Sequence, residues 1–195
     1  MLNRQDFFRT YWNYYLMLEK RFSTTLDYVD LSESNYQTFS NEYASLILTI
    51  GSELDNFFKE YCNINRDHGN MKEYIRYLQQ TDPNIKDEII HTKERYIDIC
   101  PFSTINESQQ LSWWYAYTSI KHNRTESFQK ASLENCLNIL AALYLLENNM
   151  LLKIAKETNE LDIPNYPSIL FYTNKQTKYT SMSEVVFKEI QTYQE

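Results

Sequence analysis

The stretch CLNILAALYLL, residues 136–146, decides the fold, because it is apolar on nearly every side. An amphipathic surface helix would show one polar face, so this pattern predicts a helix that is buried all round. The apolar run from Ile139 to Leu146 is far shorter than the roughly 20 residues that span a bilayer. We therefore expect a helix from about Glu126 to Lys156 to be the central helix of a helical bundle.

Two further helices are predicted before the middle of the chain. Apolar residues recur at steps of three and four within residues 5–29, which is typical of one face of a helix. A second stripe of this kind follows Ser40, a residue that commonly caps a helix N-terminus, and continues to about Cys62. Both segments should pack an apolar face against the central helix.

Capping patterns indicate two more helices. Asn70 and Glu73 have the spacing of a capping box, so a short helix should begin there. Another helix is expected from Asn106 to about His122. The prediction is therefore an all-α fold, a bundle of about five helices formed by residues 1–159.

Two segments fit the helical pattern poorly. Residues 84–105 could form a helix in their first half and extended chain in their second half. Residues 160–195 are predicted to be a C-terminal appendage, in which segments 169–172 and 179–187 flank a polar turn and favour a small β-hairpin. A short final helix from Ser183 is the competing interpretation.

The composition excludes several classes of protein. Only 2 glycines occur, whereas Rossmann and P-loop enzymes need clustered glycines at their phosphate sites. The net charge of -7 opposes broad, sequence-independent binding to DNA, although it leaves room for a small basic site. No secretory signal is recognised at the start, so we expect a cytoplasmic protein without a membrane partner. Free thiols are expected in that reducing compartment, since no metal-ligand or redox spacing joins Cys62, Cys100 and Cys136.

The run Lys121-His122-Asn123-Arg124 holds the residues best suited to chemistry. A histidine can gain or lose a proton near neutral pH, and an arginine offers a planar fork that fits a phosphate. We therefore take His122 and Arg124 as candidate catalytic residues, and Lys121 and Asn123 as candidate binding residues. The other two histidines are predicted to lie on the surface: His68 and His91.

Three residues elsewhere are candidate neighbours of this run. Glu53 falls on the apolar stripe of the second helix, where a carboxylate needs a partner, and Arg124 is the candidate partner. Trp114 and Tyr117 precede the run by about two turns and one turn of helix, and they could line a cleft or stack on bases. Nothing in the spacing supports a metal site or a cofactor.

A purely structural interpretation of the same residues stays open. Cations in the last turn of a helix offset its negative end by roughly 0.3–1 kcal/mol, and Lys121 and His122 could do only that. An ion pair between Arg124 and Glu53 could simply hold the second helix in place. The aromatic residues before the run could belong to the core.

Two stretches resemble the HEPN-like helical families of prokaryotes, some of which are linked to phage defence and toxin–antitoxin systems. They are SWWYAYTSIKHNRTESFQKASLENCLNILAALYLLE, residues 112–147, and YVDLSESNYQTFSNEYASLILTIGSELDNFFKEYC, residues 28–62, which together cover about a third of the chain. In these families an aromatic-rich helix ends in a polar motif and a long helix rich in Asn, Ala and Leu follows. The resemblance implies a bundle of four or five helices and often a homodimer.

In active members the resemblance implies a metal-independent ribonuclease, in which the ribose 2′-hydroxyl attacks the adjacent phosphate at the dimer cleft. His122 would then transfer a proton, and Arg124 and Lys121 would hold the phosphate. The family pattern places an arginine before the histidine with four to six residues between them, whereas here Arg124 follows His122. Two hypotheses result: a protein that binds or cleaves RNA or a nucleotide, or a non-catalytic protein-interaction module that dimerises through helix faces.

Overall fold

The computed structural model describes residues 2–63, 69–105, 111–158, 164 and 166–174. The fold is mostly helical and carries a small three-stranded antiparallel sheet in the order β2-β1-β3. The elements follow one another along the chain as α1 (Arg4–Phe7), η1 (Phe8–Trp12), α2 (Asn13–Thr25), η2 (Glu33–Asn35), α3 (Asn41–Tyr61), α4 (Met71–Thr81), η3 (Ile85–Asp87), β1 (Ile90–Thr92), β2 (Asp98–Ile99), α5 (Ser112–His122), α6 (Arg124–Ser127), η4 (Phe128–Lys130), α7 (Leu133–Thr158) and β3 (Phe171–Tyr172).

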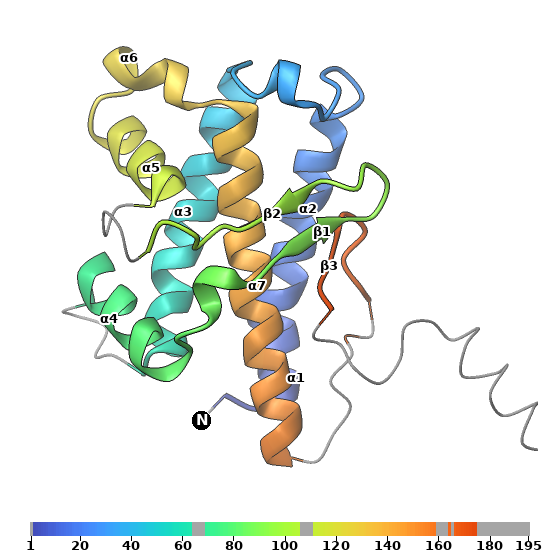
Figure 1. Ribbon diagram of the computed structural model, residues 1–195, viewed down its shortest axis with the longest axis vertical. Coiled ribbons are helices and arrows are strands. Elements are labelled where there is room, and N and C mark those ends of the chain that lie inside the picture. Colours follow the sequence, from blue (N-terminus) through green and yellow to red (C-terminus); the bar gives the residue numbers. More distant parts are fainter. Residues whose placement is uncertain (1, 64–68, 106–110, 159–163, 165, 175–195) are drawn as a thin grey trace, which may run out of the picture.

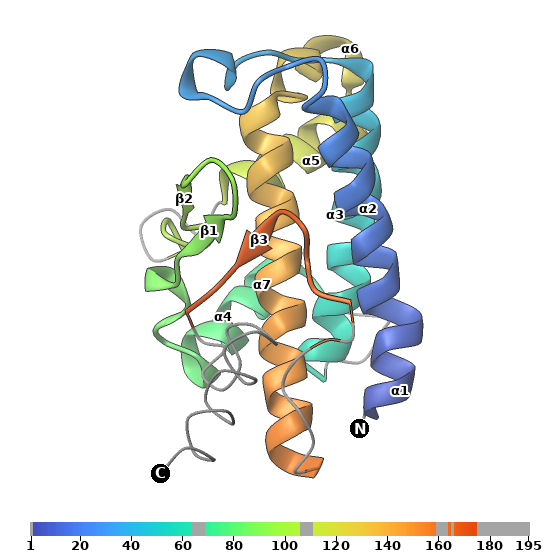
Figure 2. The same cartoon turned by 90° about the vertical axis from the view of Figure 1, so that its right-hand side faces the viewer.

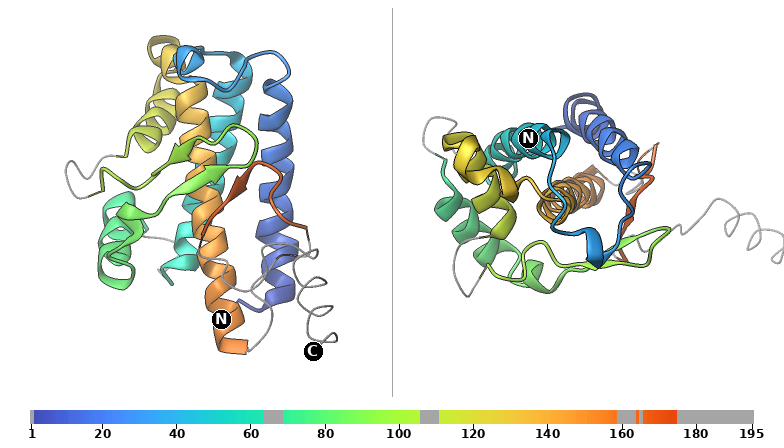
Figure 3. Two further views of the ribbon diagram at one scale, coloured as in Figure 1. Left: turned by 45° about the vertical axis from the view of Figure 1, so that its right-hand side comes forward. Right: turned by 90° about the horizontal axis from the view of Figure 1, so that it is seen from above.

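Helix α7 lies at the centre of the molecule. Seen along its axis, it is surrounded by α2, α3, α4, α5 and the strands (Figure 3). Every residue from Ile139 to Leu151 is buried, which confirms the central helix expected from the apolar stretch. Helices α2 and α3 pack along one side of α7, and the strands cross its other side (Figure 1).

The first predicted helix is confirmed as one continuous run of α1, η1 and α2. The side chain of Asn3 caps it by accepting a hydrogen bond from the backbone N–H of Asp6 at 2.8 Å. Tyr15, Leu18 and Phe22 are buried, as their helical spacing predicts. A π-helical turn, η1, interrupts the α-helix between Phe8 and Trp12, and no feature of the sequence had indicated it.

The second and third predicted helices are confirmed together with their caps. The Ser40 side chain accepts a hydrogen bond from the Tyr43 N–H at 3.0 Å and begins α3. The Asn70 side chain accepts hydrogen bonds from the first turn of α4, including the N–H of Glu73 at 3.2 Å. Helix α4 ends before Pro83, because a proline disfavours helical backbone in the residue that precedes it.

The predicted start of the central helix, near Glu126, is wrong. The short helices α6 and η4 occupy residues 124–130, and α7 begins only at Leu133. The backbone between them pairs with an earlier segment instead: the N–H of Ser40 donates to the carbonyl of Ala131, and the N–H of Leu133 donates to that of Thr38. These long-range bonds satisfy groups that would otherwise bond within a helix, so the helix is broken there.

The helix considered for the first half of residues 84–105 is also absent. Strands β1 and β2 form a hairpin in which Ile90 faces Ile99. Thr92 and Ile97 exchange hydrogen bonds across the turn, and Tyr96 in that turn has a positive φ of 53°. Left-handed backbone at Tyr96 is incompatible with a continuing helix.

The first arm of the predicted C-terminal hairpin, residues 169–172, contains a strand. Strand β3 pairs with β1, with Phe171 opposite Thr92, and lies across α7 (Figure 2). The Phe171 ring is buried against that of Tyr144, at 5.5 Å between ring centres. The predicted second arm, residues 179–187, and the competing helix from Ser183 lie outside the described residues. The domain boundary near residue 160 stays a prediction.

A buried carboxylate holds this C-terminal segment in place. Glu19 of α2 is only 1% exposed and accepts hydrogen bonds from four groups. They are the hydroxyls of Tyr15 and Ser168 and the backbone N–H groups of Ile169 (2.9 Å) and Leu170 (3.1 Å). Because a buried carboxylate is costly unless hydrogen-bonded, these donors make Glu19 a structural anchor for residues 168–170.

Candidate functional site

The run of residues 121–124 lies at the junction of α5 and α6, at the end of the molecule where α3 begins (Figure 1). Helix α5 starts at Ser112 in the described chain, and residues 106–110 of the predicted helix lie outside it. Asn123 leaves the helical conformation, and its side chain accepts the N–H of Glu126 at 3.4 Å to begin α6. All four side chains of the run are exposed to solvent.

The two cations and the histidine of the run have few contacts. Lys121 Nζ lies 3.3 Å from the Tyr117 hydroxyl and 5.4 Å from the centre of the Tyr117 ring. Arg124 Nη2 lies 3.5 Å from the Asn41 side-chain oxygen. Within the described chain, Lys121, His122 and Arg124 form no ion pair with a carboxylate. The charges of Lys121 and Arg124 therefore face solvent, and Lys121 also offsets the negative end of α5.

The predicted pair between Arg124 and Glu53 does not exist. Arg124 contacts Asn41 at the start of α3, and Glu53 follows Asn41 by twelve residues, which is about 18 Å along a helix. Glu53 is half-buried and instead lines a groove formed by η1, α2 and α3. Burial raises the pKa of its carboxyl above the ordinary value.

Tyr117 does not line an open cleft. It is 4% exposed, and its ring packs on Gly51 of α3, where a side chain would collide with it. Trp114 is half-buried, with its ring 4.9 Å from that of Tyr117, and Trp113 is buried and donates to the Pro101 carbonyl at 2.7 Å. These aromatic residues belong mainly to the core, as the structural interpretation expected.

An exposed aromatic residue next to the run had not been predicted as part of the site. Tyr115 is 47% exposed, and Lys130 of η4 lies over its ring at 5.2 Å from the centre. Since Tyr115 precedes His122 by seven residues, or about two turns, both lie on one face of α5. The seven-residue spacing between Tyr115 and His122 can be read from the sequence. The position of Lys130 cannot, because it depends on the break in the helix before α7.

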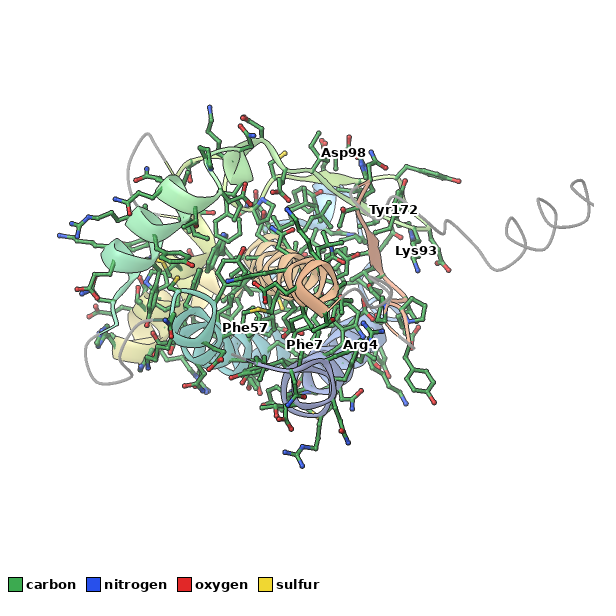
Figure 4. The ribbon with its side chains drawn as sticks, turned by 90° about the horizontal axis from the view of Figure 1, so that it is seen from below. Arg4, Phe7, Phe57, Lys93, Asp98 and Tyr172 are labelled. Atoms are coloured by element: carbon green, nitrogen blue, oxygen red, sulfur yellow. The ribbon has the colours of Figure 1, made fainter. Side chains whose placement is uncertain are left out.

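The other two histidines lie elsewhere. His68 is outside the described residues. His91 lies in β1, not on the helix face that was considered for it, and its Nδ1 is 2.7 Å from the Asp98 carboxylate. Its ring packs at 5.0 Å from that of Tyr172 in β3, so this histidine ties the small sheet together (Figure 4 labels Asp98 and Tyr172).

The central helix contains a buried acid that the sequence reasoning overlooked. Glu147 is fully buried, and neither of its carboxyl oxygens has a hydrogen-bond partner in the described part of the chain. Burial, and secondarily the charge of Glu53, raises its pKa well above the ordinary value. The signal in the sequence was the polar triplet Glu147-Asn148-Asn149 inside an apolar helix.

Replacing Glu147 with glutamine is expected to stabilise the protein at neutral pH. The pKa of Glu147 is higher in the folded chain than in the unfolded chain, so the folded chain holds this proton more tightly. The free energy of unfolding of the wild type therefore falls as the pH rises from the unfolded pKa to the folded pKa. One such proton contributes a slope of about 1.4 kcal/mol per pH unit. Urea unfolding should give the wild type and Glu147→Gln the same free energy of unfolding at pH 4. As the pH rises to 8, the free energy of unfolding of the variant should increasingly exceed that of the wild type.

The exposed residue Glu157 provides the matched control, because Glu157→Gln makes the same chemical change without the burial. A Glu147→Gln protein with the pH dependence of the wild type would contradict the assignment of a neutral, buried Glu147.

The described residues contain no candidate metal centre and one helix that is long and apolar enough to span a bilayer. Among these residues, no group of three or more His, Cys, Asp or Glu side chains could hold a metal ion. Helix α7 is long and apolar enough to cross a bilayer, but 78% of its most apolar window is buried inside the protein, as in the core helix of a soluble protein. Cys62, Cys100 and Cys136 are free thiols, as predicted.

Comparison of the chain with protein-family models, with curated proteins and with solved structures gave no match. The HEPN-like resemblance therefore remains a prediction from the sequence.

Proposed function

We propose that this protein binds single-stranded RNA through the exposed run Lys121-His122-Asn123-Arg124. One observation carries the proposal: all four side chains are exposed, and neither Lys121 nor Arg124 forms an ion pair with a carboxylate of the described chain. Cations that are not neutralised internally remain available to phosphate groups. Arg124 offers a bidentate fork, Lys121 a point charge and His122 a further donor.

Exposed aromatic rings beside the run support a single-stranded ligand. Tyr115 shares a face of α5 with His122, and Phe39, 44% exposed, packs edge-on against Phe128 of η4. Proteins that bind single strands combine cations for the backbone with aromatic rings on which bases stack. Tyr115 with Lys130 over its ring fits this combination.

The acidic balance of the chain limits the size of such a site. With a net charge of -7, long-range attraction to RNA is weak, so affinity must come from local contacts. Two or three phosphate contacts imply a shallow dependence on salt, with a slope of about −0.7 per contact for single strands.

The HEPN-like resemblance extends the proposal to the whole molecule: a helical bundle, a homodimer and a cytoplasmic role in phage defence or in a toxin–antitoxin system. Strand cleavage belongs to the proposal only for a dimer, because the family site forms between two copies. There His122 would move the proton of the attacking 2′-hydroxyl, and Arg124 would hold the phosphate.

The expected result is that Lys121→Ala/Arg124→Ala weakens binding of a short fluorescent single-stranded RNA by at least about tenfold in an anisotropy titration at low salt. The salt slope should also fall, by about 1.4 for two lost phosphate contacts. The matched control is Lys72→Ala/Arg76→Ala, which removes the same two charge types from the exposed face of α4. Equal affinity of both double variants would overturn the proposal.

Cleavage is tested separately with His122→Ala in the same titration. If the protein cleaves RNA, this variant should bind the RNA and leave it intact while the wild type shortens it. Expression of both forms in growing cells, with total RNA examined on a gel, extends the comparison to the proposed toxin role.

A non-catalytic protein-interaction module is the second candidate. Tyr166 and Ile169 favour it, because they are 71% and 61% exposed while their backbone is hydrogen-bonded, Ile169 to Glu19 and Tyr166 to the Trp12 side chain. Large exposed apolar side chains on a fixed backbone are typical of protein interfaces. On this hypothesis the wild type does not bind the RNA above background, and substitution at residues 121 and 124 does not change the titration.

A further inference from the structure

A groove away from residues 121–124 has the features of a small-molecule site. It lies between the first helical run and α3, encloses about 430 Å³, and is lined by Thr10, Tyr11, Tyr14, Glu53, Asn56, Lys59 and Glu60. This volume lies in the range of ligand pockets. Thr10 and Tyr11 belong to the π-helical turn η1, and such turns occur frequently at functional sites.

One carboxylate of the groove, Glu53, has no counterion among the described residues. Lys59 is neutralised within its own helix by Asp55, at 2.7 Å between Nζ and the carboxylate oxygen. Glu53 forms no hydrogen bond or ion pair with any other residue in the described part of the chain, and its burial already disfavours its charge. A half-buried carboxylate of this kind is most readily stabilised by a cation.

Aromatic rings form part of the same wall. The Tyr11 ring packs edge-on against Phe57 of α3 at 5.0 Å between centres, and Tyr14 follows one turn later. Phe57 itself lies between α3 and α7 (Figure 4). The faces of aromatic rings attract cations, so both the carboxylate and the rings favour a positive ligand.

Glu147 lies at the same height along the helices as the groove. Helix α7 runs antiparallel to α2 (Figure 2), and Tyr144 packs on Trp12 and Tyr15, at 6.1 and 5.7 Å between ring centres. One turn further along α7, Glu147 therefore comes level with η1, where Tyr11 lines the groove. Both carboxyl oxygens of Glu147 are buried without a partner in the described chain, and its electrostatic interaction with Glu53 indicates that the two acids are close.

We propose that this groove binds a small linear organic amine, whose ammonium group is held by Glu53 with Glu147 behind it. An ammonium group brings three N–H donors, and both carboxyl oxygens of Glu147 lack a donor within the described chain. It also brings the positive charge that lets Glu147 ionise, so the two buried acids gain a common counterion. A divalent metal fits less well, because no third ligand of metal-binding type completes a site in the described residues.

The test uses butane-1,4-diamine as the probe and isothermal titration of the full chain. The wild type should bind in the micromolar to millimolar range, Glu53→Gln should weaken binding by at least about tenfold, and Glu147→Gln by a smaller factor. Each glutamine variant replaces an acid whose ionisation burial disfavours by a neutral side chain of similar shape, so both are expected to fold. The matched control is Glu33→Gln, which removes an exposed carboxylate in η2 and should bind like the wild type.

The proposal is overturned if the wild type shows no heat of binding in the millimolar range, or if Glu53→Gln binds the diamine as the wild type does. Binding of magnesium ion with the same dependence on Glu53 and Glu147, in place of the diamine, would overturn the ligand class. Since Lys121 and Arg124 are not involved, Lys121→Ala/Arg124→Ala should bind the diamine normally whatever the outcome with RNA.

Discussion

Glu19→Ala is expected to lower the free energy of unfolding by about 3 kcal/mol. The substitution leaves the hydroxyls of Tyr15 and Ser168 and the N–H groups of Ile169 and Leu170 without their acceptor. Each buried donor that loses its partner costs about 1–3 kcal/mol, and partial release of the C-terminal segment limits the sum. Urea unfolding measures the loss, and faster amide exchange at Ile169 and Leu170 should accompany it.

Glutamine at position 19 is expected to be nearly as damaging, although it has almost the same shape. One carboxylate oxygen accepts the N–H of Leu170 and the other that of Ile169, so either orientation of the amide turns an NH₂ group toward a backbone donor. Glu33→Ala, at an exposed acid without such donors, is the control. Stability of Glu19→Gln within experimental error of the wild type would show that the carboxylate does not hold this segment.

Gly51→Ala should also destabilise the protein, by about 2 kcal/mol, even though alanine is favoured over glycine within a helix by about 1 kcal/mol. The new methyl carbon would lie 2.3 Å from Cδ2 and 2.4 Å from Cγ of the Tyr117 ring. That ring is buried and packed against Trp114, so it cannot rotate away without moving α5. Because α5 carries residues 121 and 122, RNA affinity should fall together with stability.

A double variant separates this collision from a general effect on α3. Tyr117→Leu removes the ring that the new methyl would meet, so Gly51→Ala/Tyr117→Leu should be more stable than the sum of the two single changes predicts, by at least about 1 kcal/mol. Ser52→Ala, on the exposed face of the same turn, should change stability little. Simple additivity of the Gly51 and Tyr117 substitutions would refute the proposed contact.

The residues of the candidate site were recognisable from their chemistry, but their neighbours were not. The run at 121–124 was predicted at a helix junction, because one helix was expected to end near His122 and the next to begin near Glu126, and the structure has a helix junction there. Glu53 was correctly expected to face a cleft or the interior, but its partner was chosen wrongly. Sequence spacing gives the face of one helix, whereas the neighbour of that face depends on how two helices are aligned along their length.

The sequence by itself determined the helical character, the caps at Ser40 and Asn70 and the burial of the apolar stretch 136–146. These features depend on local periodicity and on side chains that bond to their own first turn, so a few consecutive residues contain the necessary information. The break before Leu133, the pairing of β3 with β1 and the anchoring of the C-terminal segment by Glu19 were decided only by the tertiary structure. Each of them joins groups more than 70 residues apart, and no local pattern specifies which distant donor or acceptor a backbone group will meet.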